Sequence, residues 1–197
     1  MSQILPVKHM LRQLLIGALV LVVIVGASTW YVVGKAMQEI VTPLKTLNPT
    51  SGGPRAIIIY SPGVSDFHQK ITDAFASGLI ASGWRVDIDT ASSQTLTDLT
   101  GYNLLVIGGP IRGGLPSKPV MDYIARVSSL NGIHVYTVLT SMGGGPQGEK
   151  YVSEWITTHG GVEVGVLSLS TMSKNTPVDG ATDAEQIAFN TAQKIPK

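Results

Sequence analysis

The stretch LLVIGGPIRGGLPSKPVMDYI, Leu104–Ile124, holds a strand, a loop and the start of a helix, in that order. Its first five residues form a short apolar run, which is typical of a strand buried on both faces of a parallel sheet. The loop from Gly108 to Pro119 contains four glycines and three prolines in twelve residues, more than a tight turn requires. Glycine lets the backbone approach a flat ligand closely, and proline stiffens the entry to the helix predicted over Pro119–Val127.

The same alternation of apolar runs and helix-length segments extends on both sides of this stretch. Strands are predicted at 56–60, 84–88, 104–108, 133–140 and 162–169. Helices are predicted over 65–82, 119–127 and 149–159, with a closing helix after Asp179. Five strands that alternate with helices require right-handed crossovers and a parallel sheet with helices on both faces. The sequence therefore predicts an α/β fold, a three-layer doubly wound sheet of five parallel strands.

In such a sheet the ligand site lies outside the carboxyl ends of the strands, so the loops that follow the strands are the candidates. The first is YSPGVSDFHQ, where Ser61, Gly63 and Ser65 precede a helix. Hydroxyls and backbone N–H groups at the start of a helix favour an anion there. The alternative is that Ser65 or Asp66 merely caps the helix.

Two further loops follow the third and fourth strands. In the first, Arg112 lies at the tip and is suited to pair with a phosphate or an electron-rich ring edge. The second reads TSMGGGPQGEK and spells the glycine pattern of a dinucleotide site. That pattern normally opens the fold, whereas here one strand follows, so we interpret the segment as a flexible loop that lines the crevice.

The run GGPIRGGLPSKPVMDYI resembles the loop after the third strand of flavodoxins and related flavin reductases. The order of the elements and the TSMGGG loop are similar too, and the resemblance covers about residues 56–170. It implies the strand order 2-1-3-4-5 and FMN as the cofactor, with its phosphate in the first loop and its ring between the other two. The residues implied are Ser61, Gly63 and Ser65 for the phosphate, Pro110, Ile111, Arg112 and Gly113 for one face of the ring, and Ser141, Met142, Gly143 and Gly144 for the other.

The resemblance implies a protein that takes part in electron transfer or flavin-dependent reduction, together with a redox partner protein. Whether it is an enzyme or an electron carrier stays open. The alternative is a flavin-free binding or accessory module, because doubly wound sheets host many functions.

The N-terminal segment Leu14–Val33, LLIGALVLVVIVGASTWYVV, is twenty residues without a charge. As a helix it would measure roughly 30 Å, the thickness of the hydrocarbon core of a bilayer. It predicts a single-pass membrane anchor, with the basic residues before it favouring an extracytoplasmic domain. The alternative is a cleaved signal peptide, because Val25-Gly26-Ala27 has the small residues of a cleavage site. The predicted divisions are a tail (1–13), a transmembrane helix (14–36), a linker (37–54) and a flavodoxin-like domain (55–197).

The composition narrows the possible partners. Fourteen Lys and Arg residues balance thirteen Asp and Glu residues with no basic stripe, so we expect no nucleic-acid partner. The absence of cysteine excludes disulfides, thiolate catalysis and iron–sulfur clusters. The four histidines are scattered without metal-ligand spacing, so the sequence predicts no metal site.

Two aspartates lie in the second predicted strand. Asp87 and Asp89 alternate with Val86 and Ile88 and therefore share one face of the strand. We expect them to be exposed charges near an edge of the sheet.

Overall fold

The computed structural model describes residues 4–143 and 145–197, which form two compact units. The first unit ends at Met37 and consists of helix α1 (Ile4–Met37), and the second is the domain Gln38–Lys197.

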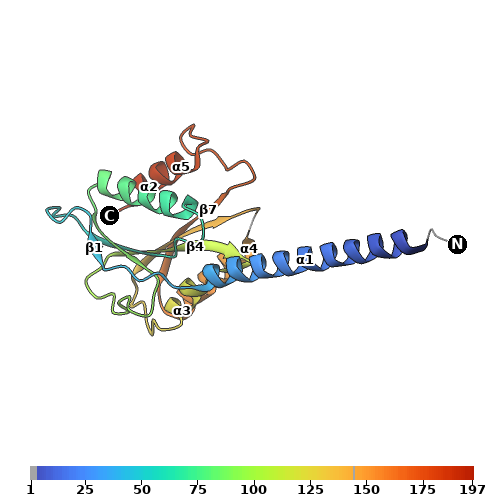
Figure 1. The fold of residues 1–197 in the computed structure, drawn as a ribbon. Coiled ribbons are helices and arrows are strands. Elements are labelled where there is room, and N and C mark those ends of the chain that lie inside the picture. Colours follow the sequence, from blue (N-terminus) through green and yellow to red (C-terminus); the bar gives the residue numbers. More distant parts are fainter. Residues whose placement is uncertain (1–3, 144) are drawn as a thin grey trace. The chain divides into compact units, whose positions relative to one another are not determined.

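The domain is built on one sheet (Figure 1). The five predicted parallel strands are present in it, in the predicted order. They lie side by side as β3-β2-β4-β6-β7, all parallel to their neighbours. Two short strands add to them: β1 pairs antiparallel with β3, and β5 pairs antiparallel with the end of β4. The bounds are β1 Lys45–Thr46, β2 Arg55–Tyr60, β3 Arg85–Thr90, β4 Leu104–Arg112, β5 Leu115–Pro116, β6 His134–Ser141 and β7 Val162–Ser170.

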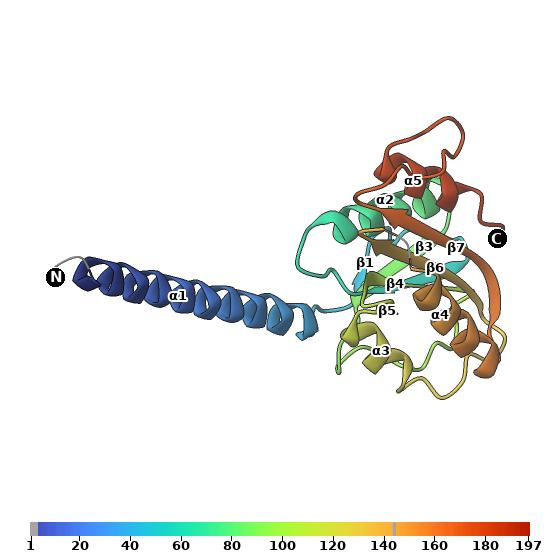
Figure 2. The ribbon, with the colours of Figure 1, turned by 90° about the vertical axis from the view of Figure 1, so that its right-hand side faces the viewer.

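Helices cover both faces of the sheet, which gives the three predicted layers (Figure 2). One core lies between the sheet and α2 and α5, and a second core faces α3 and α4. Ile58 and Ile57 illustrate the division, because neighbours on a strand point to opposite faces and both are fully buried. The bounds are α2 Phe67–Ala81, α3 Lys118–Ile124, α4 Pro146–Thr158 and α5 Ala184–Gln193.

Strand β4 continues four residues beyond the expected end at Gly108 and turns back into β5. The turn consists of Gly113 and Gly114, both with positive φ (57° and 85°). A two-residue hairpin turn of this kind needs positive φ at both positions, which glycine adopts without strain. Much of the predicted loop is therefore a small hairpin that projects beyond the sheet.

Helix α1 contains a candidate membrane span, His9–Tyr31, with a mean hydropathy of 2.3. Its length and composition suffice to cross a bilayer, and a signal sequence near an N-terminus has the same properties. The helix begins before the predicted span and also includes basic residues that precede it.

The sequence marks residues 37–54 as a linker, but parts of this segment are hydrogen-bonded to the edge of the sheet. Strand β1 pairs with β3, and the Asn48 side chain donates to Trp84 O (2.7 Å) and accepts from Val86 N (2.9 Å). The segment therefore belongs to the domain as a cover on β3 rather than forming a free connection.

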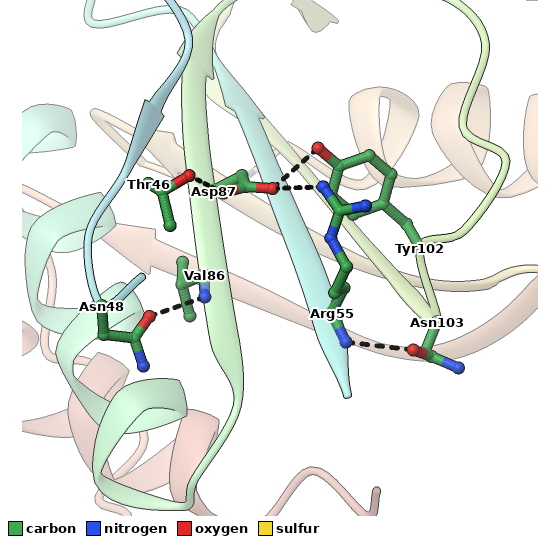
Figure 3. Close-up of polar contacts among 7 residues, drawn as sticks. All are labelled: Thr46, Asn48, Arg55, Val86, Asp87, Tyr102 and Asn103. Atoms are coloured by element: carbon green, nitrogen blue, oxygen red, sulfur yellow. Dashed lines mark hydrogen bonds and ion pairs between the residues drawn. The ribbon is translucent and has the colours of Figure 1, made fainter. Parts of the chain in front are cut away.

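The expectation of exposed charges at Asp87 and Asp89 is wrong. Their exposed fractions are 1% and 5%, because β1 and the residues before it cover the edge where these side chains lie. The Asp87 carboxylate accepts hydrogen bonds from Thr46 Oγ1 (2.5 Å), Arg55 Nη2 (2.8 Å) and Tyr102 OH (2.8 Å), as Figure 3 shows. The guanidinium of Arg55 also lies over the Tyr102 ring, 4.3 Å from its centroid.

The two buried carboxyls differ in their pKa. Burial raises the pKa of Asp87, but the hydrogen bonds from Thr46, Arg55 and Tyr102 outweigh it and hold the pKa below its usual value. Burial also raises the pKa of Asp89, and the bonds from Thr90 and Thr42 offset this only in part, so its pKa stays above the usual value. Asp87 is thus a compensated buried charge, and Asp89 is not.

Candidate functional site

A cavity of about 730 Å³ opens at the carboxyl edge of the sheet, where the fold places its ligand site. Its volume lies in the range of roughly 300–1,000 Å³ that is usual for cofactor pockets. Three loops that are far apart in the sequence surround it. Nine of the eleven predicted site residues line it: Gly63, Ser65, Pro110, Ile111, Arg112, Gly113, Ser141, Met142 and Gly143.

The two other predicted site residues do not contribute to this lining. Ser61 is buried beneath the cavity, where its backbone N–H donates to Gly108 O (3.0 Å) and continues the pairing of β2 with β4. Gly144 lies outside the described residues.

The loop after β2 reaches the cavity through Gly63, which has a φ of 80°. A Cβ added to Gly63 would lie 2.9 Å from the ring of Pro110, which also lines the cavity. Both the backbone conformation and the close approach require glycine at this position. The loop then turns into α2, whose first N–H groups have no partner within the helix.

Asp66 precedes α2 without capping it, because its side chain makes no hydrogen bond to the helix backbone. The carboxylate instead forms an exposed ion pair with Lys70 (2.8 Å), and that bond lowers the pKa of Asp66. Asp66 is therefore not the cap of this helix, and its negative charge is balanced by Lys70, one turn further along the helix.

The hairpin of β4 and β5 forms the opposite wall, and the start of α4 packs behind it. Ile111 packs against Gly148, where an added Cβ would lie 3.0 Å from its Cδ1, and against Gly145, where a Cβ would overlap with it. These glycines of the fourth-strand loop thus make room for the hairpin. Met142 is 71% exposed at the rim, and Arg112 is exposed near the hairpin tip.

His68 lines the cavity and was not predicted as a site residue. It lies in the first turn of α2 and is fully buried, with Nδ1 hydrogen-bonded to Thr140 Oγ1 (3.1 Å). Nε2 has no hydrogen-bond partner among residues 4–143 and 145–197. Burial lowers the pKa of His68 to about 3, so the ring is neutral at physiological pH. In the sequence, the position of His68 directly after the first loop indicates that it lies near the site. The spacing of the histidines, which would indicate a metal site, does not single it out.

The neutral state of His68 should make stability fall in mild acid. The pKa of His68 is about 3 in the folded state and 6.5 in the unfolded state. The contribution of the neutral ring to the free energy of unfolding is therefore fully present above pH 6.5 and is lost as the pH falls towards 3. Between pH 6.5 and pH 5 the free energy of unfolding should fall by roughly 2 kcal/mol. Urea unfolding of His68→Gln, which keeps a polar group but does not titrate, should show a flatter profile across this window. Equal pH slopes in the two proteins would contradict the assignment.

A second cavity, of about 630 Å³, lies at the opposite edge, between the segments that lead into β4 and β6. It is lined by polar loop residues and by Trp84 and Lys197. It lies where the chain enters β4 and β6, at the amino ends of these strands, so the fold favours the carboxyl edge as the functional site.

No protein-family model and no curated protein matches the chain. Solved structures do match. Flavodoxin 2 from Bacillus cereus is 16% identical, with a TM-score of 0.58 over 70% of this chain and 94% of that chain. Megasphaera elsdenii flavodoxin, in its two-electron reduced form, is 15% identical (TM-score 0.57, 70% and 98%). A flavodoxin of Streptococcus pneumonia TIGR4 is 19% identical (TM-score 0.53, 73% and 100%). The domain therefore has the flavodoxin-like α/β fold.

Proposed function

We propose that this chain is a membrane-anchored flavodoxin-like protein that binds FMN in the cavity at the carboxyl edge and takes part in electron transfer or flavin-dependent reduction. The observation that carries the proposal is the convergence of three separate loops on one cavity of cofactor size. The flavodoxin-like fold supports it, because this is the edge where such sheets bind ligands.

The phosphate of FMN would be held at the start of α2. The unpaired N–H groups of the first turn and the positive end of the helix dipole favour an anion, and the helix is fifteen residues long. Gly63 lets the backbone before α2 lie close to Pro110 in the cavity wall. The ion pair of Asp66 with Lys70 reduces the repulsion between the Asp66 carboxylate and a bound phosphate.

The ring of FMN would lie between the hairpin and the loop after β6. Pro110 and Ile111 supply an apolar wall on one side, and Met142 lies on the other. When bound, the flavin supplies the redox chemistry, whereas these side chains orient it, exclude water and influence its potential.

The anchor in this proposal is the span 14–33, retained in the mature protein and inserted in the lipid bilayer, with the domain on the extracytoplasmic side. The supporting observation is the length and apolar character of the candidate span. Carbonate washing of membranes and the intact mass of the extracted protein test it. Retention in the pellet with the full mass supports an anchor, and a soluble chain shortened after Ala27 supports a cleaved signal peptide.

Purification of the full chain in detergent tests the cofactor. We expect a yellow protein, or a colourless one whose melting temperature rises on addition of FMN, because a ligand at a hundred times its Kd stabilises by about 2.7 kcal/mol. A folded, colourless chain whose melting temperature does not respond to FMN supports the flavin-free accessory module instead. The placement of Ser61 beneath the cavity favours that alternative.

Arg112→Ala should weaken FMN binding about tenfold and leave the free energy of unfolding nearly unchanged. Arg112 is exposed and lines the cavity, and a hydrogen bond to a charged group contributes roughly 1.5–3 kcal/mol. Lys174→Ala is the matched control, since Lys174 is an exposed basic residue outside the lining. Flavin fluorescence titration measures both. Equal FMN affinity in Arg112→Ala and the unmodified chain would remove Arg112 from the site.

A further inference from the structure

The chain enters the domain at the same edge of the sheet as the cavity. The Glu39 carboxylate accepts hydrogen bonds from Ser93 N (2.6 Å) and Ser93 Oγ (2.7 Å). Thr90, the last residue of β3, donates from Oγ1 to Ile40 O (2.5 Å). The first residues of the domain are thus fastened beside the carboxyl end of β3.

That end of β3 adjoins the cavity. Ala91 N donates to Tyr60 O (2.8 Å), which joins the carboxyl ends of β3 and β2. Pro62 and Gly63, directly after β2, line the cavity. The attachment point and the cavity mouth therefore lie about one or two strand spacings apart, roughly 5–10 Å.

The chain length between the candidate span and the domain is short. The span ends at Tyr31, and the domain begins at Gln38. A helical connection of seven residues covers about 10 Å. The amino edge of the sheet lies farther from this attachment point by the length of a strand. A strand of six to nine residues measures roughly 20–30 Å. If α1 spans the bilayer, the tether keeps the carboxyl edge within reach of the lipid headgroups.

Exposed apolar and basic side chains belong to the cavity lining or lie within three residues of it in sequence, as on a membrane-contacting surface, and the nearby Asp66 carboxylate is paired with Lys70. We call Val64, Leu115, Met142 and Met172 the mouth rim. All four are exposed, and Met142 and Met172 reach 71% and 74%. Arg112 and Lys174 are exposed basic side chains that neighbour the rim in sequence, and anionic lipids attract such residues.

We propose that the mouth rim docks on the headgroup region of the bilayer that holds the chain's own anchor, so that the cavity opens towards the membrane. The inference rests on the anchor in the proposed function and does not require bound flavin. Its occupant is the lipid surface, because the tether attaches at this edge and is too short to carry the rim far from the lipid.

Single-cysteine labelling tests this cleanly, because the chain has no cysteine of its own. Met142→Cys and Met172→Cys report on the rim, and Ser128→Cys is the matched control, exposed at the opposite edge of the sheet. Each full-length variant is labelled with a fluorophore and reconstituted without flavin into phosphatidylcholine–phosphatidylglycerol vesicles that carry a spin-labelled lipid. Quenching at positions 142 and 172 should be several-fold stronger than at position 128.

Equal quenching at the three positions, or stronger quenching at 128, overturns the inference. Vesicles that retain the chain but quench none of the labels also overturn it and leave a protein partner as the occupant of the rim. A chain that fails to float with the vesicles overturns the anchor on which the inference rests. FMN affinity in detergent is measured separately, so failure of the docking and failure of the cofactor assignment are distinguishable.

Discussion

Asp87→Asn is expected to lower the free energy of unfolding by about 2 kcal/mol at neutral pH, because the buried carboxylate loses charge-assisted hydrogen bonds, while solvent screens the half-exposed Arg55 in part. Asp87 is buried and accepts three hydrogen bonds, among them that of Arg55. Burial, and the bond to Asp87, also raise the pKa of Tyr102 to about 12, so its hydroxyl stays a donor. The amide offers one acceptor oxygen where the carboxylate offers two. Urea unfolding of the full chain in detergent, followed by circular dichroism, measures the loss.

The pH dependence of the same variant is a second readout. The pKa of Asp87 is lowered in the folded state, so its contribution is present above the unfolded pKa of about 3.9 and is lost as the pH falls through the folded pKa. The stability difference between the unmodified chain and Asp87→Asn should therefore shrink below about pH 4.

Asp89→Asn is the matched control for Asp87→Asn, on the same strand and with the same chemical change. The pKa of Asp89 is raised by burial, so its charged form costs stability at neutral pH. The amide can keep the bond from Thr90 N (2.7 Å). We expect Asp89→Asn to be as stable as the unmodified chain or more stable. Equal losses in both variants would contradict the assignment of the ion pair as the stabilising element.

Gly63→Ala is expected to weaken FMN binding by at least tenfold. An alanine at φ 80° costs about 1–2 kcal/mol, and its Cβ would press on Pro110 at 2.9 Å. Because Pro110 lines the cavity, relief of that contact moves the loop, the hairpin or both away from the positions that hold the ligand. A displacement that costs 1.4 kcal/mol of binding free energy already gives a tenfold change in Kd.

Gly132→Ala separates strain from site geometry. Gly132 has nearly the same φ, 78°, but no atom of the described part of the chain lies within 4 Å of an added Cβ, and it lines the cavity at the opposite edge. Both variants should lose similar stability, whereas Gly63→Ala alone should lose FMN affinity in a flavin fluorescence titration. A parallel loss of affinity in Gly132→Ala would show that backbone strain, rather than contact at the cavity wall, sets the effect.

The sequence predicts the parallel sheet because its strands are apolar on both faces. Runs such as Ala56–Tyr60 and Leu104–Gly108 are typical of strands buried on both faces, and the structure places both in the centre of the sheet. The carboxyl-edge rule then locates the cavity from the strand order alone. Nine predicted residues meet there because each lies at the carboxyl end of a parallel strand or just beyond it.

The features that were missed depend on contacts between segments far apart in the sequence. Thr46 and Asn48 lie in a stretch without apolar periodicity, so nothing local predicts that it covers β3 and buries Asp87. The buried position of His68 could not be predicted locally, because its ring is hydrogen-bonded to Thr140, seventy-two residues away. Ser61 was expected to face a ligand by its position after β2, but the pairing of β2 with β4 continues through its N–H.

The central claim is that the carboxyl-edge cavity binds FMN with its phosphate at the start of α2. Equilibrium titration of the folded full chain in detergent with FMN and with riboflavin, which lacks the phosphate, tests it most directly. We predict saturable binding of FMN at one site and at least tenfold weaker binding of riboflavin, since hydrogen bonds to a charged group contribute roughly 1.5–3 kcal/mol. A folded chain that binds neither compound at high micromolar concentration, or binds both equally, would contradict the claim.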